Sequence, residues 1–437
     1  KKWSSYDATV ALQYNVPFIE GLSLKLMYNQ FNKHTFIKQF NRPYPLYKFE
    51  TSGGHNHLQT SNVVKEMVIR DDGDYLLEKY NKDNSYQLNA IITYNHRFGK
   101  HDVGGTFKYE GTVDWFNAQR KYFISNIVDE LFAGSSDPKD SSVDGKGSET
   151  GRLSYVGRVN YGYDDKYLLE ASFRYDGSVN KRWGFFPSVS AAWRISEENF
   201  FKNNVRFVDY LKLRSSVGLL GNDAVGGWQW QQNYSLNSGA YFGELSNGLS
   251  AGVVPNPNIT WEKSLSYNGG LDAALFKNRL SLSVEGFFKH TYDILGDRLA
   301  SLPTTFGAKM PAENYAVINS KGFEIELGWQ DKIGSDVQYW VKGNIGYATN
   351  KLIEKDEAEN LRAYKSELGL NTDRKMGYVA TGIIRTQADL DALPEGYTIF
   401  GEKPELGMLN YRDLRGPNSD TPDGIIDEND QDWIINH

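Results

Sequence analysis

Apolar and polar residues alternate at every second position along much of this chain, and this feature constrains its fold more than any other. The pattern is clear at residues 22–29, 86–95, 167–176, 280–289 and 323–330. A period of two places all the apolar side chains on one face of a β-strand. About twelve segments of roughly 10–14 residues follow it, longer than the usual strand of about 5–6 residues. We therefore predict an all-β fold, with short helices only at 387–393 and 116–132 and a helical turn within 197–206.

The connections between these segments alternate strictly in length. The short ones lie at 17–20, 99–100, 164–165, 277–278 and 332–335. The long ones lie between them, at 32–84, 113–151, 221–264, 293–320 and 350–437, and the 177–184 link is a shorter member of this set. In an antiparallel sheet this order gathers the long loops at one end, which a soluble sandwich or propeller does not require. Outer-membrane barrels have short periplasmic turns and long outer loops, and tilted strands of this length cross a hydrocarbon layer. The pattern favours an antiparallel transmembrane β-barrel.

The composition is compatible with a membrane barrel and excludes several other classes. No run approaches the about 20 apolar residues of a transmembrane helix. Aromatic residues make up 14% of the chain, and many lie at strand ends, as in the two interfacial girdles of a barrel. Aromatic residues also favour strands in general. The absence of cysteine excludes disulfides, thiolate zinc sites and cysteine nucleophiles, and the net charge of −7 gives no basic surface for nucleic acid.

The polar face of the predicted strands would line the interior of the barrel. It carries both signs of charge, which fits a wet or plugged lumen better than an ion-selective pore. The charged residues predicted on this face are Arg158, Arg174, Arg194, Lys212, Arg214, Glu285, Lys289, Glu324, Glu326 and Lys342.

Residues 151–222 carry a specific resemblance. The segments that carry it include Leu153-Ser154-Tyr155-Val156-Gly157-Arg158, Phe173-Arg174-Tyr175-Asp176-Gly177-Ser178 and Trp193-Arg194-Ile195-Ser196-Glu197-Glu198. Further similar segments lie at 256–264, 319–324 and 377–383. Over nearly its whole length the chain resembles the SusC/RagA family of TonB-dependent outer-membrane transporters of Bacteroidetes.

The resemblance implies a 22-stranded barrel plugged by an N-terminal domain, in the outer membrane of a Gram-negative bacterium. Residues 1–437 look like the middle part of that barrel, without the plug, and the five long links look like its extracellular loops. It also implies energy from the TonB–ExbB–ExbD complex, received through the missing plug. A SusD-like surface lipoprotein would cover the loops. The substrate would be a glycan or peptide too large for simple porins.

One candidate site is an aromatic loop. Trp228, Trp230, Tyr234 and Tyr241 lie there among several glutamines and an asparagine. Aromatic faces and amides suit stacking on a sugar or contact with a peptide. The alternative is packing against neighbouring loops or a partner, since loop aromatics often serve interfaces.

A second candidate is an acidic loop, with Asp413, Asp423, Asp427 and Asp430 as possible calcium ligands. It resembles the family's acidic loop, which is itself similar to an EF-hand loop, and closely spaced carboxylates suit a hard cation. Two features depart from the family pattern: Arg415 stands at the position of an oxygen ligand, and 416–422 looks like an insertion. The alternative is a solvated acidic loop.

No catalytic motif is present in the sequence, neither a nucleophile elbow nor a phosphate loop. Glu324 and Glu326 on one strand face could imitate a glycosidase pair, but a charged lumen wall is the simpler account. We therefore predict a transporter and no enzyme. Two alternatives remain open: a soluble all-β carbohydrate-active or carbohydrate-binding protein, and a passive porin.

Overall fold

The computed structural model describes nine stretches of the chain: residues 1–41, 44–52, 58–70, 75–123, 141–178, 181–223, 229–241, 245–298 and 310–434. Among these residues, none of the helices has the length and apolar character needed to cross a bilayer.

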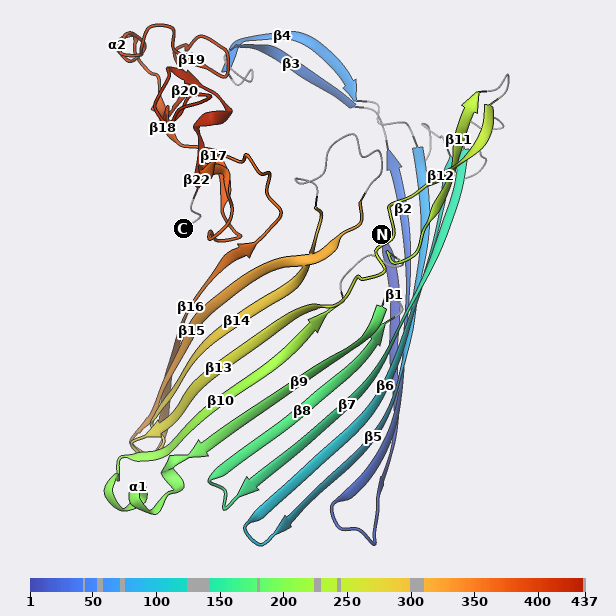
Figure 1. Cartoon of the computed structure of the whole chain (residues 1–437), viewed down its shortest axis with the longest axis vertical. Coiled ribbons are helices and arrows are strands. Elements are labelled where there is room, and N and C mark those ends of the chain that lie inside the picture. The colour runs from blue at the N-terminus through green and yellow to red at the C-terminus, as the bar shows by residue number, and fades with distance from the viewer. Residues whose placement is uncertain are drawn as a thin grey trace.

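A single antiparallel sheet of twelve strands dominates the structure, as the alternation predicts. Each strand pairs with the next strand of the sheet, and the sheet is open between its first and last strands (Figure 1). In sheet order the strands are β1 (Lys2–Asn15), β2 (Leu22–Asn41), β5 (Tyr75–Phe98), β6 (His101–Phe123), β7 (Ser141–Tyr163), β8 (Tyr167–Ser178), β9 (Lys181–Arg194), β10 (Val208–Asn222), β13 (Glu262–Leu275), β14 (Leu280–Gly296), β15 (Glu313–Ile333) and β16 (Val337–Glu354).

The strands are tilted and the sheet curves, as in a segment of a barrel wall (Figure 1). The connections β1–β2, β5–β6, β7–β8, β13–β14 and β15–β16 lie at one end, together with α1 (Asn199–Asn204) between β9 and β10. The other end carries the hairpin of β3 (Tyr44–Ser52) and β4 (Leu58–Arg70) and that of β11 (Tyr234–Tyr241) and β12 (Leu245–Ala251). We call the two ends the turn end and the loop end. Which side of a membrane each end faces stays a prediction.

Several strands are longer than the alternation predicts. β2 continues to Asn41 and pairs there with Tyr75, the first residue of β5, so both strands extend into the segment 32–84. β6 and β7 remain paired as far as Phe123 and Ser141. The helix predicted at 116–132 is therefore wrong for residues 116–123, because backbone pairing with β7 takes up their hydrogen-bonding groups. The rest of that predicted helix lies outside the described residues.

The other two predicted helical segments are confirmed. α2 spans Gln387–Asp391, and Thr386 caps it by accepting a hydrogen bond from the Asp389 amide. The turn within 197–206 contains α1. Glu198 precedes α1 and accepts hydrogen bonds from the Tyr167 hydroxyl (2.6 Å) and the Trp193 indole (3.2 Å). These bonds hold the pKa of Glu198 below its usual range and tie the turn to the sheet.

The residues after β16 form a small unit with its own core at the loop end. Its short strands are β17 (Lys375–Tyr378), β18 (Ala380–Ile383), β19 (Thr398–Ile399), β20 (Leu409–Tyr411), β21 (Ile425–Ile426) and β22 (Gln431–Ile434). Ile384, Tyr397, Ile399, Met408 and Ile426 are buried together in it. We call residues 375–434 the C-terminal unit. Burial of these apolar side chains gives this segment, which the pattern assigns to a long loop, a fold of its own.

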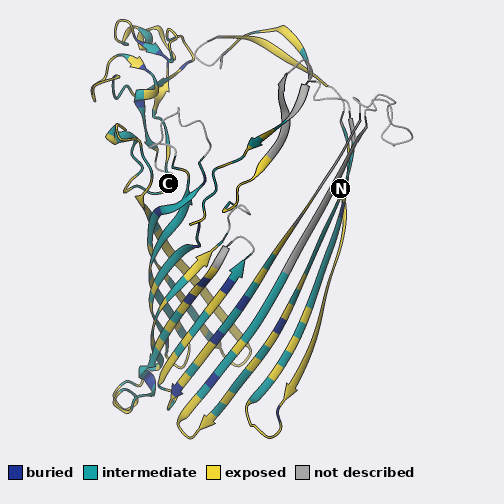
Figure 2. Ribbon diagram, turned by 45° about the vertical axis from the view of Figure 1, so that its right-hand side comes forward, coloured by how far each residue is buried: buried dark blue, intermediate teal, exposed yellow. Residues whose placement is uncertain are grey.

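The sheet itself has one apolar and one polar face, and exposed and partly buried residues alternate along parts of several inner strands (Figure 2). On the apolar face, aromatic rings form two bands. Near the turn end, Tyr167 stacks on Trp193 with centroids 6.5 Å apart. Nearer the loop end, Tyr175 stacks on Trp183 at 4.7 Å. Eight residues separate Tyr167 from Tyr175, about 26 Å along an extended strand. Two aromatic bands around an apolar zone are the pattern of the lipid-facing side of a barrel.

Candidate functional site

The polar face of the sheet gathers most of the chemistry of the chain. Residues directly opposite each other on paired strands lie on the same face. Arg158 is opposite Ser172, Arg194 is opposite Lys212, and Glu285 is opposite Glu324. Followed strand by strand, the register places all ten charged residues predicted for this face together on it. This part of the sequence prediction is confirmed.

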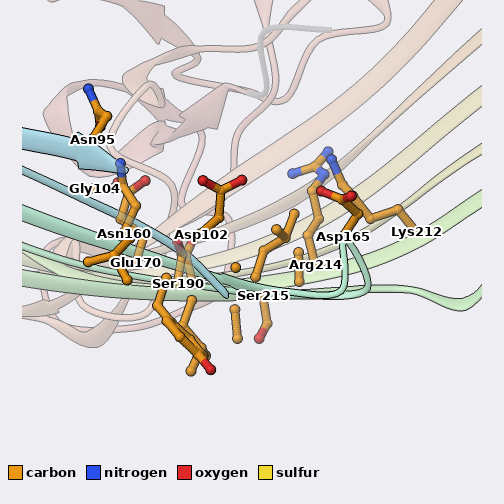
Figure 3. A pocket seen from close by; sticks show the side chains of 18 of the residues that line it. Asn95, Asp102, Gly104, Asn160, Asp165, Glu170, Ser190, Lys212, Arg214 and Ser215 are labelled. Atoms are coloured by element: carbon orange, nitrogen blue, oxygen red, sulfur yellow. The ribbon is translucent and has the colours of Figure 1, made fainter. Parts of the chain in front are cut away.

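Two adjoining hollows lie along this face. The first, of about 580 Å³, is lined from β5 to β13 (Figure 3). Asn160 and Glu170 lie on one side of it in Figure 3, and Lys212 and Arg214 on the other. The second hollow, of about 1230 Å³, continues toward the loop end and shares Glu170 with the first. A surface that collects residues from seven neighbouring strands in one hollow is concave, so the polar face is the inner face of the curved sheet.

Arg214 is the centre of a charge network in the first hollow. Its guanidinium lies 2.5 Å from Glu285 and 3.2 Å from Asp272. Lys212 lies 3.1 Å from the same Asp272 oxygen, and the Ser283 hydroxyl donates to the other oxygen at 2.9 Å. These groups come from β10, β13 and β14. A Cβ atom on Gly270 would lie only 2.8 Å from the guanidinium carbon, so a larger residue there would shift the Arg214 side chain.

A second network lines the other hollow. Arg174 donates two hydrogen bonds to the Asp176 carboxylate, of 3.1 and 3.0 Å, and a third to the Ser154 hydroxyl at 3.2 Å. Asp176 and Ser154 are buried beneath it. Nearby, Arg158 lies 2.5 Å from Glu170 on the neighbouring strand. Because opposite charges are paired, the inner face presents many donors and acceptors with little net field.

Sequence reasoning named the cations of these networks but missed three of their anions, of which Asp176 lies on β8 two residues from Arg174. Asp272 lies on the polar side of β13 and Glu170 on the polar side of β8. The sequence alternation could have shown this, because each acidic residue occupies a position of its strand that faces the same side of the sheet as its cationic partner. Glu326, considered as half of a glycosidase pair, instead contacts Lys342 at 2.5 Å across β15 and β16.

The aromatic loop is described only in part. Trp228 lies outside the described residues, and Tyr241 is described only as the last residue of β11. Trp230 and Tyr234 are 39% and 61% exposed. Both lie at the loop end, where β11 pairs with β12. Their role in binding a substrate stays a prediction.

The four acidic-loop residues lie in the C-terminal unit, and their carboxylates accept backbone N–H groups. Asp430, which is fully buried, accepts from the amides of Leu414 (2.7 Å), Arg415 (3.0 Å) and Asp427 (2.9 Å). Asp413 accepts from Gly424 at 2.7 Å. Asp423 and Asp427 each accept from an amide two residues further along the chain. Within the described residues, no group of three or more histidine, cysteine or acidic side chains is placed to hold a metal ion.

The charges of two of these aspartates also act on a buried tyrosine. Burial first, and then Asp413 and Asp430, raise the pKa of Tyr397 to about 12. Its hydroxyl donates to Asn410 at 2.8 Å.

Comparisons with known proteins agree on one family. The family model described as TonB dependent receptor-like, beta-barrel matches residues 2–420. A TonB-dependent receptor of Formosa agariphila is 30% identical over 365 residues, which cover 80% of this chain and 35% of that protein. The TonB-dependent receptor SusC of Bacteroides thetaiotaomicron is 30% identical over 244 residues, covering 52% of this chain and 24% of SusC.

Among solved structures, one chain of the RagAB peptide transporter matches with a TM-score of 0.72 at 20% identity. The match covers 99% of this chain and 44% of that one. This chain thus spans less than half the length of each of the relatives named here.

Proposed function

This chain belongs to the TonB-dependent receptor β-barrel family, and from that premise we propose that it is part of an importer for a glycan or peptide nutrient in the outer membrane of a Gram-negative bacterium of the Bacteroidetes. One observation carries the proposal: the sheet has an apolar outer face with two aromatic bands and an inner face of paired charges. Lipid suits the first face and a hydrated, polar cargo suits the second.

The inner face favours movement of a large polar solute over conduction of one kind of ion. Paired charges such as Arg214 with Glu285 present hydrogen-bonding groups to a passing molecule without the single-sign field of a selective pore. Two cargo classes are candidates: RagAB is named a peptide transporter, and the resemblance of the sequence to the SusC/RagA family implies a glycan or a peptide. We infer that the cargo is one of these two classes.

Energy and capture would come from other parts of the system. The sequence contains no phosphate loop, so the work of import would be supplied by another protein. We propose the TonB–ExbB–ExbD complex, acting through a plug, and a SusD-like lipoprotein over the loop end. The family is one of transporters and receptors, which argues against the carbohydrate-active alternative. A passive porin is the remaining competitor.

Orientation is tested by surface labelling. Asn258 lies in the long connection between β10 and β13, and Asn278 lies in the short turn between β13 and β14. In the full-length protein on intact cells, we expect a membrane-impermeant thiol reagent to label Asn258→Cys and leave Asn278→Cys unmodified. After cell lysis both should react. Equal labelling on intact cells would refute the proposed orientation.

Energy coupling is tested by deleting the TonB-contact segment of the full-length protein. We expect uptake of a radiolabelled oligosaccharide or oligopeptide pool to stop while surface binding persists. The control is the unmodified protein at matched surface abundance. Uptake that continues unchanged after the deletion would favour a passive porin, and the importer proposal would have to be abandoned.

A further inference from the structure

The residues that resemble an insertion in the acidic loop surround one arginine. Arg362 lies in the segment between β16 and the C-terminal unit. One terminal nitrogen of its guanidinium donates to the carbonyl oxygens of Gly416 (2.9 Å) and Pro417 (3.3 Å) and to the Asn429 side chain (3.2 Å). The other donates to the Ser419 carbonyl and the Asp420 carboxylate, both at 3.0 Å.

This set of acceptors has the chemistry of a cation site. Three backbone carbonyls, one amide oxygen and one carboxylate are the kinds of oxygen ligand that a hard cation takes in proteins. The Asn429 amide nitrogen donates to Asp427 at 2.9 Å, which turns its oxygen toward Arg362. Here a guanidinium takes these oxygens, and its planar fork of N–H donors is charged at every physiological pH.

The carboxylates expected to bind calcium are engaged elsewhere in the same loop. Asp430 accepts three backbone amides, and Asp413 accepts the amides of Asp423 and Gly424. An ion bound by these four aspartates would have to break such bonds or share them. The donor set of the loop therefore does not fit a calcium site as it stands, whereas it does fit Arg362.

The arginine also joins two parts of the chain. Tyr364, two residues further on, lies under both Arg362 and Arg415, with guanidinium carbons 5.0 and 4.0 Å from its ring centroid. Its carbonyl accepts the indole N–H of Trp433 at 2.8 Å. The segment that leaves β16 is thus fastened to both the acidic loop and β22.

We propose that Arg362 is the built-in cation of the 413–430 loop and replaces the calcium ion that the family resemblance implies. It holds the loop closed, and it secures the C-terminal unit to the wall strand β16 at any concentration of divalent cation. Arg415, at the position where the family pattern has an oxygen ligand, belongs to the same arrangement because it stacks on Tyr364 instead of binding an ion.

Hydrogen exchange in the full-length protein tests this proposal. The backbone amides of Gly416 and of residues 418–421 are followed in detergent with excess EGTA and with excess calcium. We expect the wild-type exchange rates to be the same in both. Arg362→Gln should speed exchange about tenfold in both, since charge-assisted hydrogen bonds are lost, and Arg362→Lys should lie between. Arg412→Gln, which changes an exposed arginine directly before this loop, is the matched control and should match the wild type.

Two outcomes would overturn the proposal. Calcium that slows exchange in the wild-type loop would identify a metal as its cation. Wild-type rates in Arg362→Gln would show that the guanidinium holds nothing in place. If the variant does not fold, the comparison of wild-type protein with and without calcium still decides, because it needs no substitution.

Discussion

Placing an arginine on the apolar face of β9 tests the assignment of the two faces. Ten residues separate Trp183 from Trp193, which at about 3.3 Å per residue is about 33 Å along the strand. With a tilt of about 40° this is about 25 Å across the membrane, the height of a barrel's apolar band. Val189, which is 52% exposed, lies four residues from Trp193. This is about 13 Å along the strand, or about 10 Å along the membrane normal at the same tilt. It is therefore within about 3 Å of the midplane.

We expect Val189→Arg to destabilise the protein by about 2–4 kcal/mol, the cost of an arginine facing lipid at that depth. Ser190 is the matched control, because it is the next residue and faces the inner hollow opposite Glu170. Ser190→Arg should cost less than about 1 kcal/mol, since a carboxylate and water surround it. Leu169 lies two residues from Tyr167, which places it about 5 Å along the membrane normal from the edge of the apolar band. Leu169→Arg should therefore destabilise the protein by only about 1 kcal/mol.

The measurement is a denaturant titration of the full-length protein folding into phospholipid vesicles, followed by the folded fraction on an unheated gel. Val189→Leu serves as a further control and should match the wild type. If Ser190→Arg lowers the free energy of unfolding as much as Val189→Arg does, the two faces of the sheet do not differ in environment. The assignment of the apolar face to lipid would then be wrong.

Three further predictions follow from single contacts. A double-mutant cycle with Arg214→Met and Glu285→Gln should give a coupling energy of about 1 kcal/mol in the same titration, and additive effects would argue against the pair. Burial and nearby carboxylates raise the pKa of Tyr397 to about 12. The contribution of this group to stability is therefore complete below its unfolded pKa of about 10 and is lost as the pH rises through 12. Urea unfolding of the C-terminal unit at increasing pH should show this loss of stability, and Tyr397→Phe should abolish the pH dependence. Glu198→Gln should speed amide exchange in the turn that holds α1, because it weakens the bond from the Tyr167 hydroxyl; unchanged exchange would mean that Glu198 does not fasten the turn.

The sequence predicts the wall of this protein well because the relevant signal is local. Lipid on one side and water on the other select a period of two, and each wall strand pairs with the wall strand nearest to it in the chain. Beyond the zone between the two aromatic bands this selection stops. Residues 37–41 of β2 continue to pair with β5, although both faces of that segment are polar or mixed. Backbone hydrogen bonds need no side-chain pattern, so the ends of the strands could not be read from the alternation.

The core of the C-terminal unit and the role of Arg362 were not predictable for different reasons. Ile384, Met408 and Ile426 meet in space from positions about twenty residues apart, with no periodicity to connect them. Three of the five acceptors of Arg362 are backbone carbonyls, which every residue carries and no letter of the sequence marks. The acidic residues could be read from the sequence, but whether they face inward to amides or outward to an ion depends on the fold.

The hairpins at the loop end have a consequence for how such a protein can diversify and be engineered. β3–β4 and β11–β12 are inserted between strands that pair directly with each other, β2 with β5 and β10 with β13. The points where each hairpin leaves and rejoins the sheet are therefore held about 5 Å apart, whatever is attached to them. Lengthening such an insert costs only about 0.6 kcal/mol per doubling. Recombination or laboratory grafting can then exchange one hairpin for an unrelated one without shifting a single strand pair of the wall.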